Sequence, residues 1–111
     1  MPSHTPPARI IQLINQIKSH LAMNYGEKIK DIILYGSYAR GEAKKDSDID
    51  VLVLVDSSLD PFEVRKSLSD LLLDILLENN ELISVVVLPS DFFEEYNYPF
   101  ILNVKKDGVK V

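Results

Sequence analysis

Hydrophobic positions along the chain repeat with two different periods, and each period predicts a different kind of element. Near the N-terminus the apolar residues fall on one face of a helix, which we place at residues 7–25 and which Gly26 would end. The residues that form this face are Ile10, Leu13, Ile14, Ile17 and Leu21. Residues 29–35 and 48–56 are rich in β-branched and aliphatic side chains, which is typical of strands. The second strand is apolar on both faces, so we expect it at the centre of a sheet.

A second helix is predicted in the middle of the chain, over residues 60–78. Asp60, Pro61 and Glu63 suit its N-cap, first and third positions, because a carboxylate can accept from free N–H groups and proline lacks one. A stripe at helical spacing follows, which we expect to be buried in the core. It comprises Leu68, Leu71, Leu72, Ile75 and Leu76.

The remaining elements complete a helix–strand–loop–strand–helix–strand–helix order. Residues 82–88 predict a third strand closed by Pro89, residues 91–96 predict a short helix, and a short mixed segment follows. This order predicts an α/β (α+β) fold, in which a small mixed β-sheet is flanked by helices. We expect one domain over residues 1–111, with residues 1–5 as a flexible leader.

The amino-acid composition and net charge exclude several classes of function. The chain has 111 residues and no cysteine, which excludes disulfides and thiolate metal sites. Its 12 Lys and Arg against 17 Asp and Glu give a net charge of −5, so no direct nucleic-acid binding is expected. The longest apolar run, at residues 51–55, is too short to span a bilayer. We therefore expect a cytoplasmic protein with no membrane partner; whether it forms a homo-oligomer stays open.

A glycine–serine pair follows directly on the first predicted strand. Gly36 allows a backbone to approach a ligand closely, and Ser37 supplies a hydroxyl and an N–H at the start of a predicted helical turn. These groups suit a phosphate. The cations of Arg40, Lys44 and Lys45 come next and are available to neutralise a triphosphate, although the lysines also fit a solvated loop.

Two carboxylates begin the second predicted strand. Asp48 and Asp50 are two residues apart, so both side chains point to the same face of the sheet. Paired carboxylates on a rigid face can hold Mg²⁺, which takes oxygen ligands and bridges to substrate phosphates. The bland alternative, an exposed edge strand that happens to start with acidic residues, fits poorly with the apolar run that follows.

The spacing of Gly36-Ser37, ten residues, and Asp48-x-Asp50, with Arg40 between them, resembles that of polymerase-β-like nucleotidyltransferases. The short chain is similar to the minimal nucleotidyltransferases (MNT) of HEPN–MNT toxin–antitoxin pairs. The resemblance implies the nucleotidyltransferase fold, with ATP as substrate held at the glycine–serine pair and Mg²⁺ as cofactor on the two aspartates. It further implies transfer of AMP to a hydroxyl, namely a tyrosine of a partner HEPN toxin.

One departure from the family keeps alternatives open. The family often has a third carboxylate on the strand after the second helix, and by spacing that position falls near Ser84, with Glu81 at the start of the strand. A serine is not a general base at neutral pH, and a residue three positions away points to the other face. The alternatives are an antitoxin with weak or no catalysis that masks its toxin sterically, and a transferase that acts on a small molecule.

Overall fold

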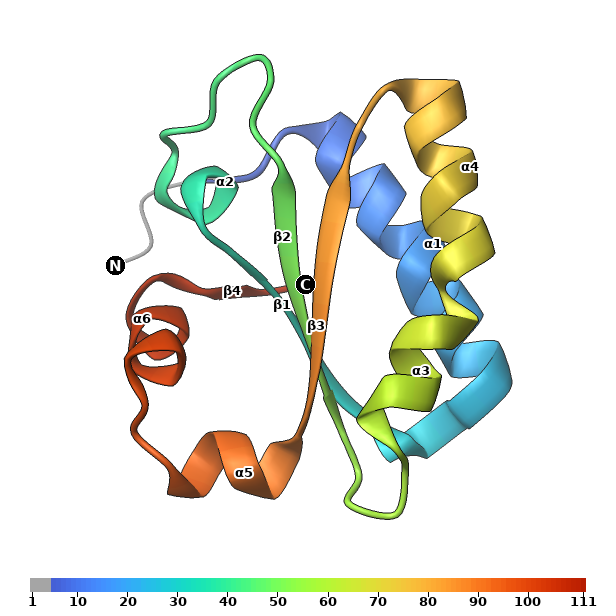
Figure 1. The fold of residues 1–111 in the computed structure, drawn as a ribbon. Helices are drawn as coiled ribbons and strands as arrows, with labels where there is room; N and C mark the ends of the chain where they lie inside the picture. The colour runs from blue at the N-terminus through green and yellow to red at the C-terminus, as the bar shows by residue number, and fades with distance from the viewer. Residues whose placement is uncertain (1–4) are drawn as a thin grey trace.

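The computed structural model describes residues 5–111 as a four-stranded sheet between two layers of helices (Figure 1). The strand order is β3-β2-β1-β4. β1 pairs antiparallel with β2 and β4, whereas β2 and β3 are parallel, so the sheet is mixed as predicted. The strands are β1 (Ile29–Tyr35), β2 (Ile49–Val55), β3 (Ile83–Pro89) and β4 (Val109–Lys110).

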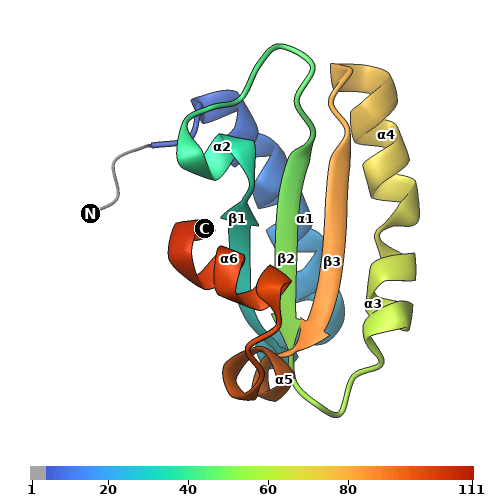
Figure 2. The same ribbon diagram turned by 60° about the vertical axis from the view of Figure 1, so that its left-hand side comes forward.

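Helices cover both faces of this sheet (Figure 2). One face packs against α1 (Ala8–Tyr25), α3 (Pro61–Ser67) and α4 (Ser69–Asn79). The other packs against α5 (Ser90–Glu95) and α6 (Pro99–Asp107). The single-turn helix α2 (Ser37–Arg40) lies above the end of β1, and a 3₁₀ turn (Gly26–Lys28) joins α1 to β1.

The alternating pleat of the sheet divides the core in two. Along β2, Val51, Val53 and Val55 face α1, while Leu52 and Leu54 face α5 and α6. All five are at most 3% exposed, which confirms that β2 is a central strand buried on both faces. The predicted helix 7–25 is confirmed within one residue, and its apolar face is fully inside the core.

The predicted helix 60–78 is wrong in one respect, because it is two helices that meet at Leu68. The Ser67 hydroxyl donates to the Val64 carbonyl at 2.7 Å, and the Leu68 N–H donates to the Arg65 carbonyl at 3.1 Å. Hydroxyl bonds to a preceding turn bend helices, and here the bend turns Leu68 fully into the core. The predicted Asp60 cap is confirmed, since its carboxylate accepts from the Phe62 N–H at 2.9 Å.

The C-terminal segment is more regular than the predicted mixed piece. Pro99 starts α6 at the first helical position, where its missing N–H costs nothing. Gly108 then allows a close approach to Ile33, because a Cβ there would lie 2.7 Å from the Ile33 Cγ2. β4 follows and pairs with Ile33 and Leu34, at the sheet edge beside β1.

Two further predictions concern the N-terminal leader and membrane-spanning segments. Most of the predicted leader, residues 1–4, lies outside the described residues. Among the helices of residues 5–111, none combines the length and apolar character that crossing a membrane requires.

Candidate functional site

The predicted phosphate-binding turn lies where β1 ends and α2 begins. Gly36 adopts φ 77° and ψ −153°, a conformation that side chains strongly disfavour. Its carbonyl accepts from the N–H groups of Ala39 and Arg40, both at 3.1 Å, which closes the single turn of α2. Gly41 ends this turn in the left-handed region. Ser37 is therefore the first residue of a short helix, as predicted from the sequence.

The second aspartate lies directly against this turn. A Cβ on Gly36 would overlap the Asp50 Oδ2 and come within 3.2 Å of its Cγ. Asp50 is opposite Tyr35 on β1 and opposite Ser84 on β3. It shares a sheet face with Leu52, one step closer to the strand end above which α2 lies. The glycine is thus required twice, by its own backbone angle and by the carboxylate beside it.

Charge and burial act together on Asp50. The pKa of its carboxyl is raised, mainly because partial burial removes water and further because the negative charge of Asp48 is near. The cation of Arg40 opposes this shift. Burial and the charge of Asp50 also raise the pKa of the Tyr35 hydroxyl. The charges of Asp48 and Arg40 therefore both act on the Asp50 carboxyl.

The donor set at this end of the sheet fits magnesium. The charge of the exposed Asp48 disfavours ionisation of the partly buried Asp50, and a divalent cation would relieve this repulsion. Within residues 5–111, no three His, Asp or Glu side chains group closely enough to form a cage for a metal. Mg²⁺ does not need one, because it commonly binds through one or two carboxylates and keeps water or phosphate oxygens as its other ligands. Asp48 and Asp50 would be its protein ligands.

Arg40 lies at the mouth of a pocket of about 210 Å³ beside the turn. It is exposed, and its Nε donates to the Glu42 carboxylate at 3.0 Å. The pocket continues from Gly36 and Arg40 to side chains of α6, among them Phe100 and Asn103. Phe100 packs edge-to-face on Tyr35, with ring centroids 5.3 Å apart. α6 therefore forms one wall of this pocket, which no short motif in the sequence predicted.

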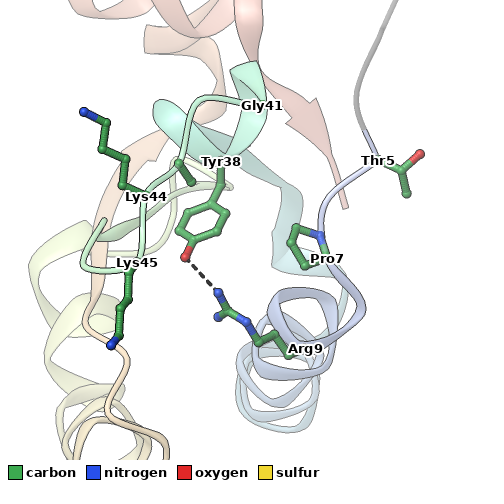
Figure 3. Close-up of a pocket in the computed structure, with 8 residues that line it drawn as sticks. Thr5, Pro7, Arg9, Tyr38, Gly41, Lys44 and Lys45 are labelled. Carbon is green, nitrogen blue, oxygen red and sulfur yellow. Dashed lines mark hydrogen bonds between the residues drawn. The ribbon is translucent and has the colours of Figure 1, made fainter.

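Lys44 and Lys45 border a different pocket, of about 340 Å³, between the start of α1 and the loop after α2 (Figure 3). Their side chains extend away from Tyr38, which forms part of the pocket lining. The loop itself is closed by a reciprocal pair, in which the Lys44 N–H donates to the Ser47 hydroxyl and the Ser47 N–H to the Lys44 carbonyl. Unlike Arg40, neither lysine lines the pocket beside Gly36 and Tyr35.

The position of the third family carboxylate is occupied by Ser84. Ser84 is paired directly with Asp50 across the parallel strands, so it lies where the spacing placed it. Glu81 forms an ion pair with Arg9 of α1, the helix on the opposite face of the sheet from Asp50. Its carboxylate is therefore engaged with a cation, in agreement with the expectation that it points away from Ser84.

Arg9 was not predicted from the sequence, although it contacts two segments near the site. It bonds to the Tyr38 hydroxyl as well as to Glu81. No short-range spacing reveals such a residue, because its partners lie 29 and 72 positions away. The only sequence signal was a basic residue in the first turn of a helix, where the helix dipole does not favour it.

β2 begins at Ile49, one residue later than predicted, so Asp50 lies in the strand and Asp48 directly before it. A mixed sheet with a glycine turn after β1 and these two aspartates is typical of a nucleotidyltransferase fold. The comparison with protein families agrees: residues 14–110 match the nucleotidyltransferase domain family. The chain therefore belongs to this family and is a nucleotidyltransferase enzyme. The family match spans all four strands described above.

Relatives named for protein adenylylation match the chain in sequence. MJ0604 of Methanocaldococcus jannaschii, which is named as a protein adenylyltransferase, is 35% identical over 100 residues, or 89% of this chain and 90% of that protein. Two more proteins so named in the same organism, MJ0141 and MJ1215, are 44% and 46% identical over 46 residues each. Those shorter matches span about half of their own lengths, at 46% and 51%.

Solved structures share the fold at low sequence identity. One is a toxin–antitoxin complex with AMP-PNP, at a TM-score of 0.59 and 24% identity over 86% of this chain and 69% of the matched chain. Another is the tri-AMPylated Shewanella oneidensis HEPN toxin in complex with MNT antitoxin, at a TM-score of 0.55 and 22% identity over 91% and 70%. At these identities the similarity establishes the fold.

Proposed function

We propose that this nucleotidyltransferase moves AMP from ATP to a hydroxyl of a partner protein, a tyrosine of a HEPN-domain toxin, and so acts as its antitoxin in the cytoplasm. The observation that carries the proposal is the contact between Gly36 and Asp50. It joins the turn that we assign to phosphate binding with Asp50, and the charge of Asp48 acts on that same carboxyl. Phosphoryl-transfer enzymes need this combination, because their catalysis consists mostly of positioning and charge neutralisation.

Each residue of the motif has a role that its place supports. Gly36 and Ser37 receive the β- and γ-phosphates, because the glycine leaves room for a close approach and the serine offers its N–H and hydroxyl. Arg40, exposed beside them, offsets their negative charge. Asp48 and Asp50 would hold Mg²⁺, which when bound neutralises phosphate charge and orients the α-phosphate.

The strand order gives the transfer a direction. The turn lies above β1, Asp50 is on β2, and Ser84 is on β3, so the three follow one another across the sheet. In an in-line displacement the acceptor oxygen bonds to the α-phosphorus, while the bond between the α-phosphorus and the leaving pyrophosphate breaks on the opposite side. We therefore place pyrophosphate on the β1 side and the acceptor on the β3 side. A depression of about 180 Å³ lies between Asp48, Leu82 and the end of α4, although neither Asp50 nor Ser84 lines it.

The identity of the acceptor rests on the named relatives. MJ0604 is named for adenylylation of proteins, and a solved structure of the same fold holds an AMPylated HEPN toxin beside its MNT antitoxin. On the side where we place the acceptor, Leu82, directly before β3, is 49% exposed. A partner protein that presents a tyrosine from that side would complete the site.

The experiment mixes the purified protein with ATP, Mg²⁺ and a cognate HEPN toxin and follows AMP on the toxin by intact mass. We expect one or more additions of AMP at tyrosine, and we expect Asp48→Asn to abolish them. Asp74→Asn, an exposed carboxylate on α4 remote from the motif, is the matched control and should label normally. Labelling that survives Asp48→Asn would contradict the proposed metal-binding role of the pair.

A second candidate, neutralisation by steric masking alone, is favoured by the serine at position 84. With Ser84 beside Asp50, the site has no carboxylate on β3 to take the acceptor proton. Masking predicts that the Asp48→Asn and Asp50→Asn proteins still protect cells that express the toxin. The transfer proposal predicts that both variants lose protection while they still bind the toxin.

A further inference from the structure

Arg9, in the first turn of α1, makes two side-chain contacts with distant parts of the chain, of which Figure 3 shows the one with Tyr38. Its Nη2 donates to the Tyr38 hydroxyl at 3.2 Å, and its Nη1 forms an ion pair with Glu81. The pKa of the guanidinium is raised, chiefly by the hydrogen bond with Tyr38 and further by the charge of Glu81. One planar guanidinium thus serves two partners at once, which a lysine could not do with the same geometry.

The first partner belongs to the helix that carries the phosphate-binding turn. Tyr38 is 5% exposed and follows directly on Ser37 in α2. This helix has a single turn, no side-chain bond at its N-cap, and a glycine at positive φ at each end. Within residues 5–111, its other side-chain hydrogen bond runs from Arg40 to a residue only two positions away. Among residues 5–111, the bond from Arg9 is thus the side-chain hydrogen bond that links α2 to a distant element, and it adds to the packing of Tyr38 and Ala39 in the core.

The second partner lies two residues before β3, the strand that pairs with β2. Glu81 precedes Leu82, and the Leu82 carbonyl accepts from the Ile49 N–H at 2.9 Å. Ile49 lies between Asp48 and Asp50 and is fully buried. The arginine is consequently linked to the turn through Tyr38 and to the carboxylate strand through Glu81, so it joins the two halves of the candidate site from behind the sheet.

We propose that Arg9 is a positioning residue, which acts through Tyr38 to hold the Gly36–Ser37 turn at a fixed place relative to Asp50. The inference rests on the proposed function and adds a residue outside the motif to the nucleotide site. Without this link, the one-turn helix between two glycines is held only by the core packing of Tyr38 and Ala39, and ATP has to supply more of its ordering. The free-energy cost of this ordering weakens ATP binding and so raises KM. It changes kcat less, because the turn is already ordered once ATP is bound.

The test compares Arg9→Gln with Tyr38→Phe in the AMP-transfer assay with the HEPN toxin. Tyr38→Phe removes one hydroxyl, changes no charge and keeps the buried ring, so it isolates the hydrogen bond. We expect each variant to raise KM for ATP by about tenfold, with kcat changed by less than about threefold. The double variant should be no worse than either single one, because both remove the same link. Arg9→Lys, which keeps the charge without the fork, should restore KM in part.

Two control variants and one readout without activity make the test decisive. Tyr25→Phe and Arg65→Gln remove the same groups away from the site and should leave KM unchanged. Amide hydrogen exchange over residues 37–41, measured without ATP, should be faster in both test variants than in wild type. A raised KM in Arg9→Gln alone would mean that the arginine acts directly on ATP and would overturn the proposal, as would unchanged exchange. If wild type transfers no AMP, the proposed function fails, and the exchange experiment still decides on Arg9.

Discussion

The carboxylate of Asp50 occupies the space that a side chain on Gly36 would need. Gly36 directly follows β1 and Asp50 lies in β2, and the antiparallel register brings them together by pairing Tyr35 with Asp50. This contact couples the backbone of the turn to the placement of the carboxylate. A change at either residue should therefore disturb phosphate binding and metal binding together.

Gly36→Ala should abolish transfer and reduce Mg²⁺ affinity. The new methyl group would displace the Asp50 carboxylate, and alanine at φ 77° is strained by about 1–3 kcal/mol. Gly26→Ala is the matched control, because Gly26 has φ 56° with nothing within 4 Å of its added Cβ. The control should lose similar stability in thermal unfolding but keep its activity. Equal activity of the two variants would show that the Gly36–Asp50 contact is not needed.

Asp50→Asn should inactivate the enzyme and yet raise its Tm when no metal is present. Because burial and Asp48 raise the folded-state pKa of Asp50, its ionised form costs stability above that pKa, and the cost disappears as the pH falls below the unfolded value. An amide avoids the cost at pH 7. We expect a Tm increase on the order of a few degrees in EDTA and no further increase with Mg²⁺. A lower Tm at pH 7 would contradict the inferred charge repulsion.

Much of this fold is readable from the sequence because the local signals agree with the tertiary structure. The strand at residues 29–35 is confirmed without change, and the apolar run of β2 indicated its central place. The bend at Leu68 escaped prediction because the apolar stripe continues through it, and only a hydroxyl bond to the preceding turn interrupts the helix. β4 has two residues, too few for a periodic pattern, and exists because β1 offers an edge.

The candidate site likewise contains residues that the sequence pattern predicted and a residue that it did not. Gly36, Ser37, Asp48 and Asp50 lie within a short stretch of sequence, and the pairing of β1 with β2 suffices to bring Gly36 against Asp50. Arg9, by contrast, reaches the site through the packing of α1 against the sheet. Residues that meet only through tertiary packing carry no local signature, so a sequence pattern does not reveal them.

Ser84→Asp should strengthen metal binding at the expense of stability without metal. The new carboxylate would lie beside Asp50 on the neighbouring parallel strand. Like charges in a partly buried place destabilise the fold, so the Tm in EDTA should fall below that of wild type. With Mg²⁺ the Tm should recover by more than the shift that Mg²⁺ produces in wild type, since binding energy adds to stability. A variant whose Mg²⁺-dependent shift equals that of wild type would show that position 84 does not reach the metal.

The pH dependence of Mg²⁺ binding should report the charge of Asp48 on Asp50. Protons compete with Mg²⁺ for a carboxylate, so affinity falls as the pH drops toward the pKa of Asp50, which lies above 3.8 because of burial and Asp48. Asp48→Asn removes the negative charge at position 48, which is one of the two causes that raise the pKa of Asp50. The titration of the Asp50 carboxyl carbon by NMR, without metal, should then move to lower pH than in wild type, while Asp74→Asn leaves it in place. A titration that does not move in Asp48→Asn would mean that the two carboxylates are too far apart to share one ion.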